Sequence, residues 1–297
     1  MSCPRVQTAI RAIGQTCELD LGKNPLYRAH EVYLKPIELM FSGMRRTDKI
    51  PVPQIAVPVI VPQQIAAVGL GSAATEKEKA VGDFALIHFF YLLRVGEYTK
   101  KKRKGSTRTI QFRRSDMAFK KGNKILSRDA SDAELMEATG ATLRLSNQKN
   151  GMRGSLIHRS AMSGIYCPVK ALVRRFIHLR NNEAEQEETI STYWDHIGKC
   201  NITDEDMRVA LRRAVIKLGL AKNGITSKRV GTHSLRAGGA MALKFAGADR
   251  DDIKKMGRWS SDTFLIYIHD QIAEYSEGWT EKMAEPRSYF NLEGAYM

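Results

Sequence analysis

The sequence lacks any closely spaced pair of cysteines. Its four cysteines, Cys3, Cys17, Cys167 and Cys200, are widely scattered and form no CxxC pair. This spacing excludes a cysteine-based zinc site and a disulfide framework, and it indicates reduced thiols in an intracellular protein. We therefore expect no bound metal and no other cofactor.

Long hydrophobic runs are also missing. The most apolar stretch, "FALIHFFYLL" at 84–93, has half the length that a membrane span needs and contains a histidine. It predicts a buried helix. The N-terminal residues lack the apolar stretch of a signal peptide, so we expect an intracellular protein without a membrane partner, nuclear if eukaryotic.

Acidic residues are scarce relative to basic ones. The chain has 32 Asp and Glu against 47 Lys and Arg, a net charge of +15. Such a balance favours a polyanionic partner, most often nucleic acid. Residues 94–125 hold twelve Lys and Arg against two acids. This segment is either a solvated loop, a nuclear-import signal or a surface that contacts DNA phosphates, for which the candidates are Lys100, Lys101, Lys102, Arg103, Lys104, Arg113 and Arg114.

Four prolines divide the chain early. Residues 1–50 show apolar residues at helical spacing, whereas 51–64 carry prolines at 51, 53, 58 and 62. We predict a short helical region, an extended linker over 51–64, and one larger domain over 65–297.

The larger domain is predicted to be mainly α with a small antiparallel β-sheet of three strands (α+β). Residues 75–98 read as one long helix, and 109–119 as a strand. The stretches 141–149 and 154–162 flank a glycine-containing turn, which predicts a hairpin with Lys149 at its tip. Thr203 is the expected N-cap of the helix that follows it.

Several polar side chains have types and spacings suited to phosphate chemistry. Arg94 follows the apolar run, and Glu97 lies three residues on, where it can pair with it. His233 and Arg236 are expected on one helical turn. Taken singly, each of these residues, and likewise Lys149, Trp259 and Tyr267, has an ordinary structural or solvated role as its alternative.

In order along the chain, these residues form a recognisable set of motifs: "LLRVGEY", "SNQKNGMRG", "THSLRAGGAMALKFAG", "MGRWSSD" and "FLIYIH". Over residues 62–285 the sequence resembles the tyrosine recombinase, or phage integrase, family, and "GRWSSD" is most similar to recombinases of eukaryotic mobile elements. The resemblance implies that residues 65–297 form the catalytic domain and that residues 1–50 are part of a core-binding domain.

The resemblance also implies roles. Tyr267 would be the nucleophile, and Arg94 and Arg236 would bind the scissile phosphate. His233 would act as base and Lys149 as the acid for the leaving 5′ oxygen. Glu97 would support Arg94. Such proteins act on double-stranded DNA as a tetramer on two duplexes, without metal or ATP, and residues 271–297 would dock on a neighbouring copy.

One position departs from the family pattern. A His or Trp usually lies nine residues before the tyrosine, whereas here Arg258 lies nine before Tyr267 and Trp259 lies eight before it. We favour Trp259 as the catalytic residue, because an indole N–H can donate to a phosphate oxygen, with Arg258 as the alternative.

Two other functions stay open at this point. A DNA-binding protein that no longer recombines would keep the basic surface, and the short N-terminal region favours it. A type IB topoisomerase shares the chemistry, but the short chain and the "GRWSSD" motif favour a recombinase.

Overall fold

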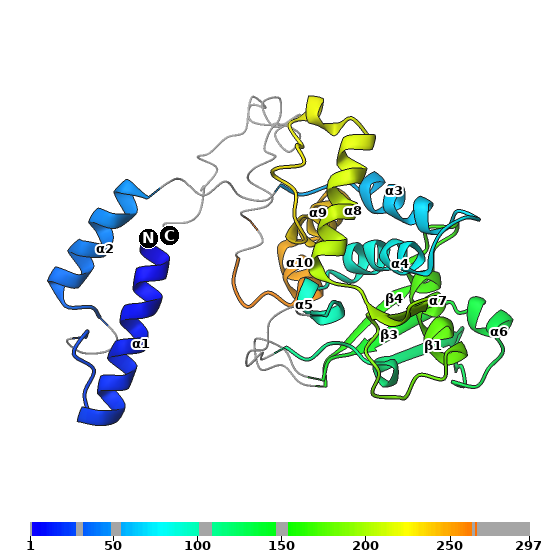
Figure 1. Ribbon diagram of the computed structural model, residues 1–297, viewed down its shortest axis with the longest axis horizontal. Coiled ribbons are helices and arrows are strands. Elements are labelled where there is room, and N and C mark those ends of the chain that lie inside the picture. Colours follow the sequence, from blue (N-terminus) through cyan, green and yellow to red (C-terminus); the bar gives the residue numbers. More distant parts are fainter. Residues whose placement is uncertain are drawn as a thin grey trace, which may run out of the picture. The chain divides into compact units, whose positions relative to one another are not determined.

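The computed structural model describes residues 2–27, 32–48, 55–100, 109–146, 154–262 and 265. It divides into two compact units, Met1–Pro53 and Gln54–Met297, and the boundary falls inside the linker predicted from its prolines (Figure 1). Among the described residues, no helix is long and apolar enough to cross a membrane.

The first unit is a pair of helices, α1 (Cys3–Leu21) and α2 (Lys35–Thr47). Cys3 and Phe41 are completely buried, and the Cys3 thiol donates to the Phe41 carbonyl at 3.4 Å. The Tyr33 ring packs edge-on against Phe41 with centroids 5.3 Å apart. The predicted helical character of this region is therefore confirmed.

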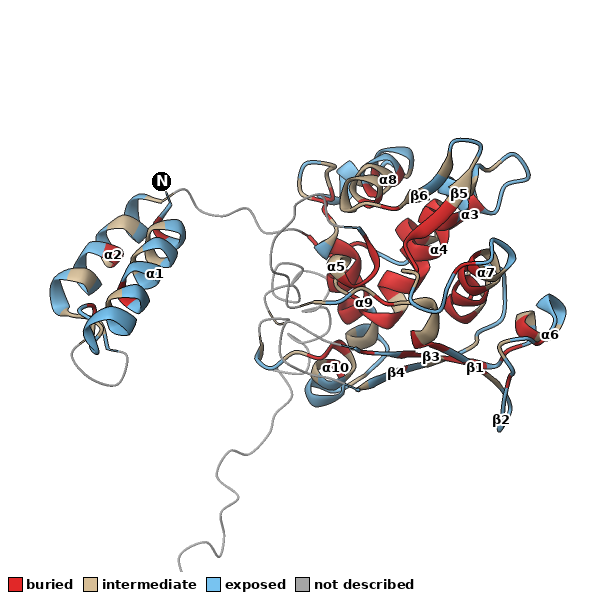
Figure 2. Ribbon diagram, turned by 60° about the horizontal axis from the view of Figure 1, so that its bottom comes forward, coloured by how far each residue is buried: buried red, intermediate tan, exposed pale blue. Residues whose placement is uncertain are grey.

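The second unit is built around one helix, α4 (Glu76–Tyr91). Thr75 starts it with a capping box, in which its hydroxyl accepts from the Glu78 backbone and the Glu78 carboxylate accepts in return. Nearly every later residue of α4 is buried (Figure 2). The elements packed against it include α3 (Ile60–Gly69), α7 (Pro168–Asn181), α8 (Asp204–Lys217) and α9 (His233–Phe245).

Shorter helices also belong to the described part of the second unit. These are α5 (Val95–Tyr98), α6 (Asp132–Met136) and α10 (Arg250–Gly257), with 3-10 turns at η1 (Arg114–Asp116) and η2 (Leu220–Asn223). Thr203 caps α8 as predicted, because its hydroxyl accepts from the Asp206 backbone at 3.3 Å.

The sheet is antiparallel with strand order β2-β1-β3-β4. Its strands are β1 (Met117–Lys121), β2 (Lys124–Ile125), β3 (Gly140–Arg144) and β4 (Leu156–Ser160). The predicted hairpin is confirmed, with Leu143 opposite Ile157 and both side chains buried. A mainly α chain with a small antiparallel sheet is therefore the observed class. Within the described residues the sheet has four strands rather than the predicted three, and a separate hairpin, β5 (Thr192–Asp195) with β6 (Gly198–Asn201), was not predicted.

Three predicted elements are wrong in detail. The strand predicted over 109–119 begins only at Met117, because the 3-10 turn η1 comes directly before it. The linker is not extended throughout, because α3 begins at Ile60 and contains Pro62. A proline in the first turn costs no hydrogen bond, since the first N–H groups of a helix have no partner within it. The predicted helix over 75–98 breaks at Leu92, which adopts a left-handed conformation with φ 52° and separates α4 from α5.

A histidine in α7 is expected to make the free energy of unfolding depend on pH. The Nε2 atom of His178 accepts from the Trp194 backbone N–H at 3.3 Å, so its Nδ1 carries the proton and faces Glu76 at 3.2 Å. Burial and then the charge of Arg175 lower the pKa of His178 to about 4, against an opposing effect of Glu76.

Because the folded pKa lies below the unfolded value, the stabilisation is present above about pH 6.5 and is lost as the pH falls towards 4. We expect chemical denaturation to show a loss of up to about 3 kcal/mol over this window from His178. His178→Gln should flatten the dependence, whereas the same change at the exposed His196 should not. An equally steep dependence in His178→Gln would contradict this assignment.

Candidate active site

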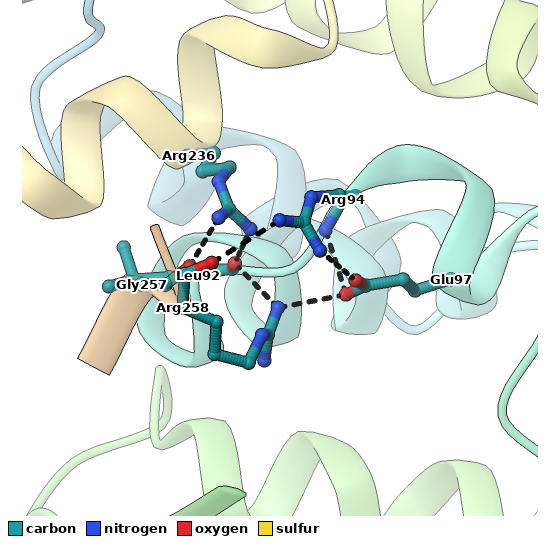
Figure 3. Close-up of polar contacts among 6 residues, drawn as sticks. All are labelled: Leu92, Arg94, Glu97, Arg236, Gly257 and Arg258. Atoms are coloured by element: carbon teal, nitrogen blue, oxygen red, sulfur yellow. Dashed lines mark hydrogen bonds and ion pairs between the residues drawn. The ribbon is translucent and has the colours of Figure 1, made fainter. Parts of the chain in front are cut away.

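Three arginines meet at the C-terminal end of α4 (Figure 3). Leu92, whose backbone N–H donates to the His88 carbonyl, ends the helix. Its own carbonyl accepts from Nη1 of Arg236 and from Nη2 of Arg258, the latter at 3.2 Å. The end of a helix carries partial negative charge, so α4 both attracts and orients these guanidinium groups.

Arg94 and Glu97 lie on the next short helix. Arg94 is the N-cap of α5, and its backbone N–H donates to Oε2 of Glu97 at 2.9 Å. Its guanidinium pairs with Oε1 of the same carboxylate at 3.3 Å, as the three-residue spacing predicted. Glu97 is completely buried, whereas the Arg94 side chain remains 21% exposed. The buried Glu97 carboxylate therefore holds the Arg94 guanidinium in place, while part of the Arg94 side chain stays exposed to solvent.

Arg236 reaches the same place from α9. It is buried, and its Nη2 donates to the Gly257 carbonyl at the end of α10. Two glycines, Gly238 and Gly239, lie in α9 shortly after Arg236, where the helix backbone packs closely against other segments of the protein. A side chain at Gly238 would overlap the Val57 carbonyl, and one at Gly239 would overlap the Phe89 carbonyl of α4. His233, the first residue of α9, is exposed.

Arg258 and Trp259 both belong to this cluster, but they contact different partners. Arg258 is buried in a left-handed conformation (φ 57°), and its Nη2 lies 3.0 Å from Oε2 of Glu97. The Trp259 ring lies against Arg236, whose Cζ is 4.4 Å from the ring centroid. The alternatives left by the sequence are therefore neighbours: Trp259 covers Arg236, and Arg258 pairs with Glu97.

The electrostatics of this group favour an anion. Arg94, Arg236, Arg258 and Glu97 together carry a net charge of +2. Burial lowers the pKa of Arg258, Glu97 raises it, and the charge of Arg94 lowers it again. Two nitrogens of the Arg258 guanidinium, Nε and Nη1, are buried without a hydrogen-bond partner. Concentrated positive charge around one carboxylate costs free energy, and a bound oxyanion offsets that cost.

The remaining predicted residues fall into two sets. Lys149, Tyr267, and the basic residues Lys101, Lys102, Arg103 and Lys104 lie outside the described part of the chain. Lys100 is exposed. Arg113 pairs with Glu187, and Arg114 donates to the Ala184 carbonyl. These two arginines therefore connect segments 74 and 70 positions apart in the sequence, and their contact with DNA stays a prediction.

In the ranges that the structure describes, no three His, Cys, Asp or Glu side chains are arranged to hold a metal ion. The sequence did not single out His88 and Tyr98, which lie buried beside the arginine cluster; a histidine inside the apolar run was the available signal.

Comparison by structure finds proteins that this chain resembles, whereas comparison by sequence finds none. No family model matches the sequence. No curated protein matches it either. The chain is similar to XerA recombinase, with a TM-score of 0.44 and 14% identity over 85% of this chain and 74% of that one.

It is also similar to the Tn1549 transposon integrase. In complex with transposon right end DNA, that integrase gives a TM-score of 0.48 with 12% identity, over 94% of this chain and 80% of its own. In complex with circular intermediate DNA, it gives 0.46 with 12% identity, over 96% and 81%. These two proteins are a recombinase and an integrase. Identities this low assign no residue. The roles proposed below therefore rest on this chain's own geometry and, for Lys149 and Tyr267, on its sequence motifs.

Proposed function

We propose that this protein cleaves and rejoins DNA strands through a covalent 3′-phosphotyrosyl intermediate, as a site-specific recombinase. The observation that carries the proposal is the convergence of Arg94, Arg236 and Arg258 on the end of α4. Arg258 and Glu97 are 161 positions apart in the sequence yet 3.0 Å apart in space. Bringing charges of one sign together at such cost supports a site for a phosphate group.

The two predicted phosphate ligands suit phosphoryl transfer. A guanidinium offers a planar fork of donors to two phosphate oxygens, which an ammonium does not. In the transition state, charge spreads over the non-bridging oxygens, and fixed donors stabilise it there. Arg94 and Arg236 supply these donors. Glu97 and the Leu92 carbonyl hold them in place before the DNA arrives.

The remaining groups supply the nucleophile and move protons. Tyr267 attacks the phosphorus, and His233, exposed at the start of α9, accepts the phenol proton. Lys149 protonates the leaving 5′ oxygen. Trp259 shields Arg236 from water by covering its guanidinium. The phosphotyrosyl bond replaces the phosphodiester bond, so a second 5′ hydroxyl reverses the step without metal or ATP.

The larger assembly is part of the same proposal. Residues 65–297 form the catalytic domain, residues 1–50 a core-binding-like region, and 51–64 the connection. The basic stretch 94–125 follows the phosphate backbone, and the protein acts in the cell, in the nucleus if eukaryotic, as a tetramer on two duplexes. Its DNA affinity falls steeply with salt, because phosphate contacts release counterions.

A nicked DNA substrate tests this proposal. When the nick lies just beyond the cleavage point, the leaving strand is lost and the covalent adduct accumulates. We expect the native chain to give an adduct on a denaturing gel, with equal yield in EDTA and in Mg²⁺. Cleavage that needs a metal would contradict the mechanism. DNA binding without any adduct would favour a DNA-binding protein, and plasmid relaxation without site preference would favour a topoisomerase.

A further inference from the structure

A polar pair is buried beside the arginine cluster. Nδ1 of His88, on α4, lies 2.5 Å from the hydroxyl of Tyr98, the last residue of α5. The two rings meet edge to face with centroids 5.0 Å apart. The side chains are 1% and 0% exposed, so water does not compete for this hydrogen bond.

This pair is costly to bury. Nε2 of His88 is buried without a hydrogen-bond partner. Burial, then the charges of Arg236 and His233, hold the pKa of His88 well below its usual range, so the ring is neutral. Two aliphatic side chains would fill this space without an unpaired nitrogen. Unpaired buried polar groups of this kind concentrate at functional sites.

The His88–Tyr98 pair connects the two groups that hold the arginines, the Leu92 carbonyl and the Glu97 carboxylate. His88 lies one helical turn before Leu92, whose carbonyl holds Arg236 and Arg258. Tyr98 directly follows Glu97, which holds Arg94 and Arg258. α5 has only four residues, and a helix this short has little packing surface to fix its own position.

We propose that the His88–Tyr98 hydrogen bond is a positioning device for the arginine cluster. It fixes α5 against α4, so that Arg94 and Arg236 are held at the separation that one phosphate requires. Neither side chain touches the DNA. This role rests on the proposed function, because its consequence is measured on the cleavage step.

Tyr98→Phe tests the role, since it keeps the ring and removes only the hydroxyl. We expect adduct formation at saturating DNA to slow about tenfold, because small misplacements of catalytic groups are costly. DNA affinity should stay within about twofold, since phosphate contacts along the duplex are untouched. Tyr91→Phe is the matched control, because its buried hydroxyl donates to the Ala141 carbonyl on β3 at 3.4 Å and not to the arginine cluster. The rate of adduct formation in Tyr91→Phe should equal the native rate.

The same substitution in an Arg94→Lys chain distinguishes a positioning role of Tyr98 from a general loss of stability. If Tyr98 acts through Arg94, its removal should matter far less in an Arg94→Lys chain, where the fork is already lost, than in the native chain. Equal effects in both backgrounds, or equal rate losses in Tyr98→Phe and Tyr91→Phe, would overturn the positioning role alone. A native chain that forms no adduct would overturn the proposed function, and this role with it.

Discussion

Replacement of Tyr267 by Phe is expected to abolish the covalent protein–DNA adduct completely. The substitution keeps the aromatic ring and removes only the attacking oxygen. Binding of the same duplex should remain within about twofold of the native value, because affinity comes from phosphate contacts made by basic side chains. A denaturing gel of the nicked substrate measures the first quantity, and a gel-shift titration measures the second.

Tyr275→Phe and Tyr289→Phe are the matched controls for this experiment. Each removes one hydroxyl from the same C-terminal part of the sequence, and both variants should form adduct at the native rate. An adduct that persists in Tyr267→Phe and disappears in one of these variants would move the nucleophile to that tyrosine.

Arg236→Ala is expected to slow adduct formation by about 10²–10³-fold, the usual effect of losing one fixed donor to the transition state. Arg236→Lys should restore little of the rate. A lysine keeps the charge but cannot donate in parallel to two phosphate oxygens. A lysine ammonium also cannot replace the planar guanidinium, which donates to the Leu92 and Gly257 carbonyls while it stacks on the Trp259 ring.

Arg174→Lys provides the control for this substitution. Arg174 is a half-buried arginine on α7 whose Nε donates to Asp83 at 2.8 Å, so its replacement disturbs folding but not the cluster. Its adduct rate should equal the native rate at a temperature where both variants are folded. Full activity in Arg236→Lys would show that charge alone suffices, and would contradict the bidentate role.

Local rules predicted much of the fold. The capped start of α8 at Thr203 follows from residues next to one another in the sequence, and so does the β3–β4 hairpin. The break at Leu92 could not be predicted, because leucine rarely adopts a positive φ. The carbonyl at this break accepts from Arg236 and Arg258, which lie 144 and 166 positions away.

In the candidate site too, contacts between residues close in sequence could be predicted, and contacts between distant residues could not. The pairing of Arg94 with Glu97 followed from a spacing of three residues. The ion pair between Glu97 and Arg258 could not be predicted from any spacing, because it depends on how α10 packs beside α5. Spacing likewise left Trp259 and Arg258 as alternatives, whereas the structure gives each a different partner. For Lys149 and Tyr267, the sequence remains the source of the assignment.

The most direct test of the central claim is to identify the amino acid that carries the DNA. The adduct trapped on the nicked substrate is digested with protease and nuclease, and mass spectrometry locates the attached nucleotide. We expect it on Tyr267, joined through a 3′ phosphate, in samples prepared with EDTA. A nucleotide on any other residue, a link through a 5′ phosphate, or strand cleavage without a covalent link would contradict the account.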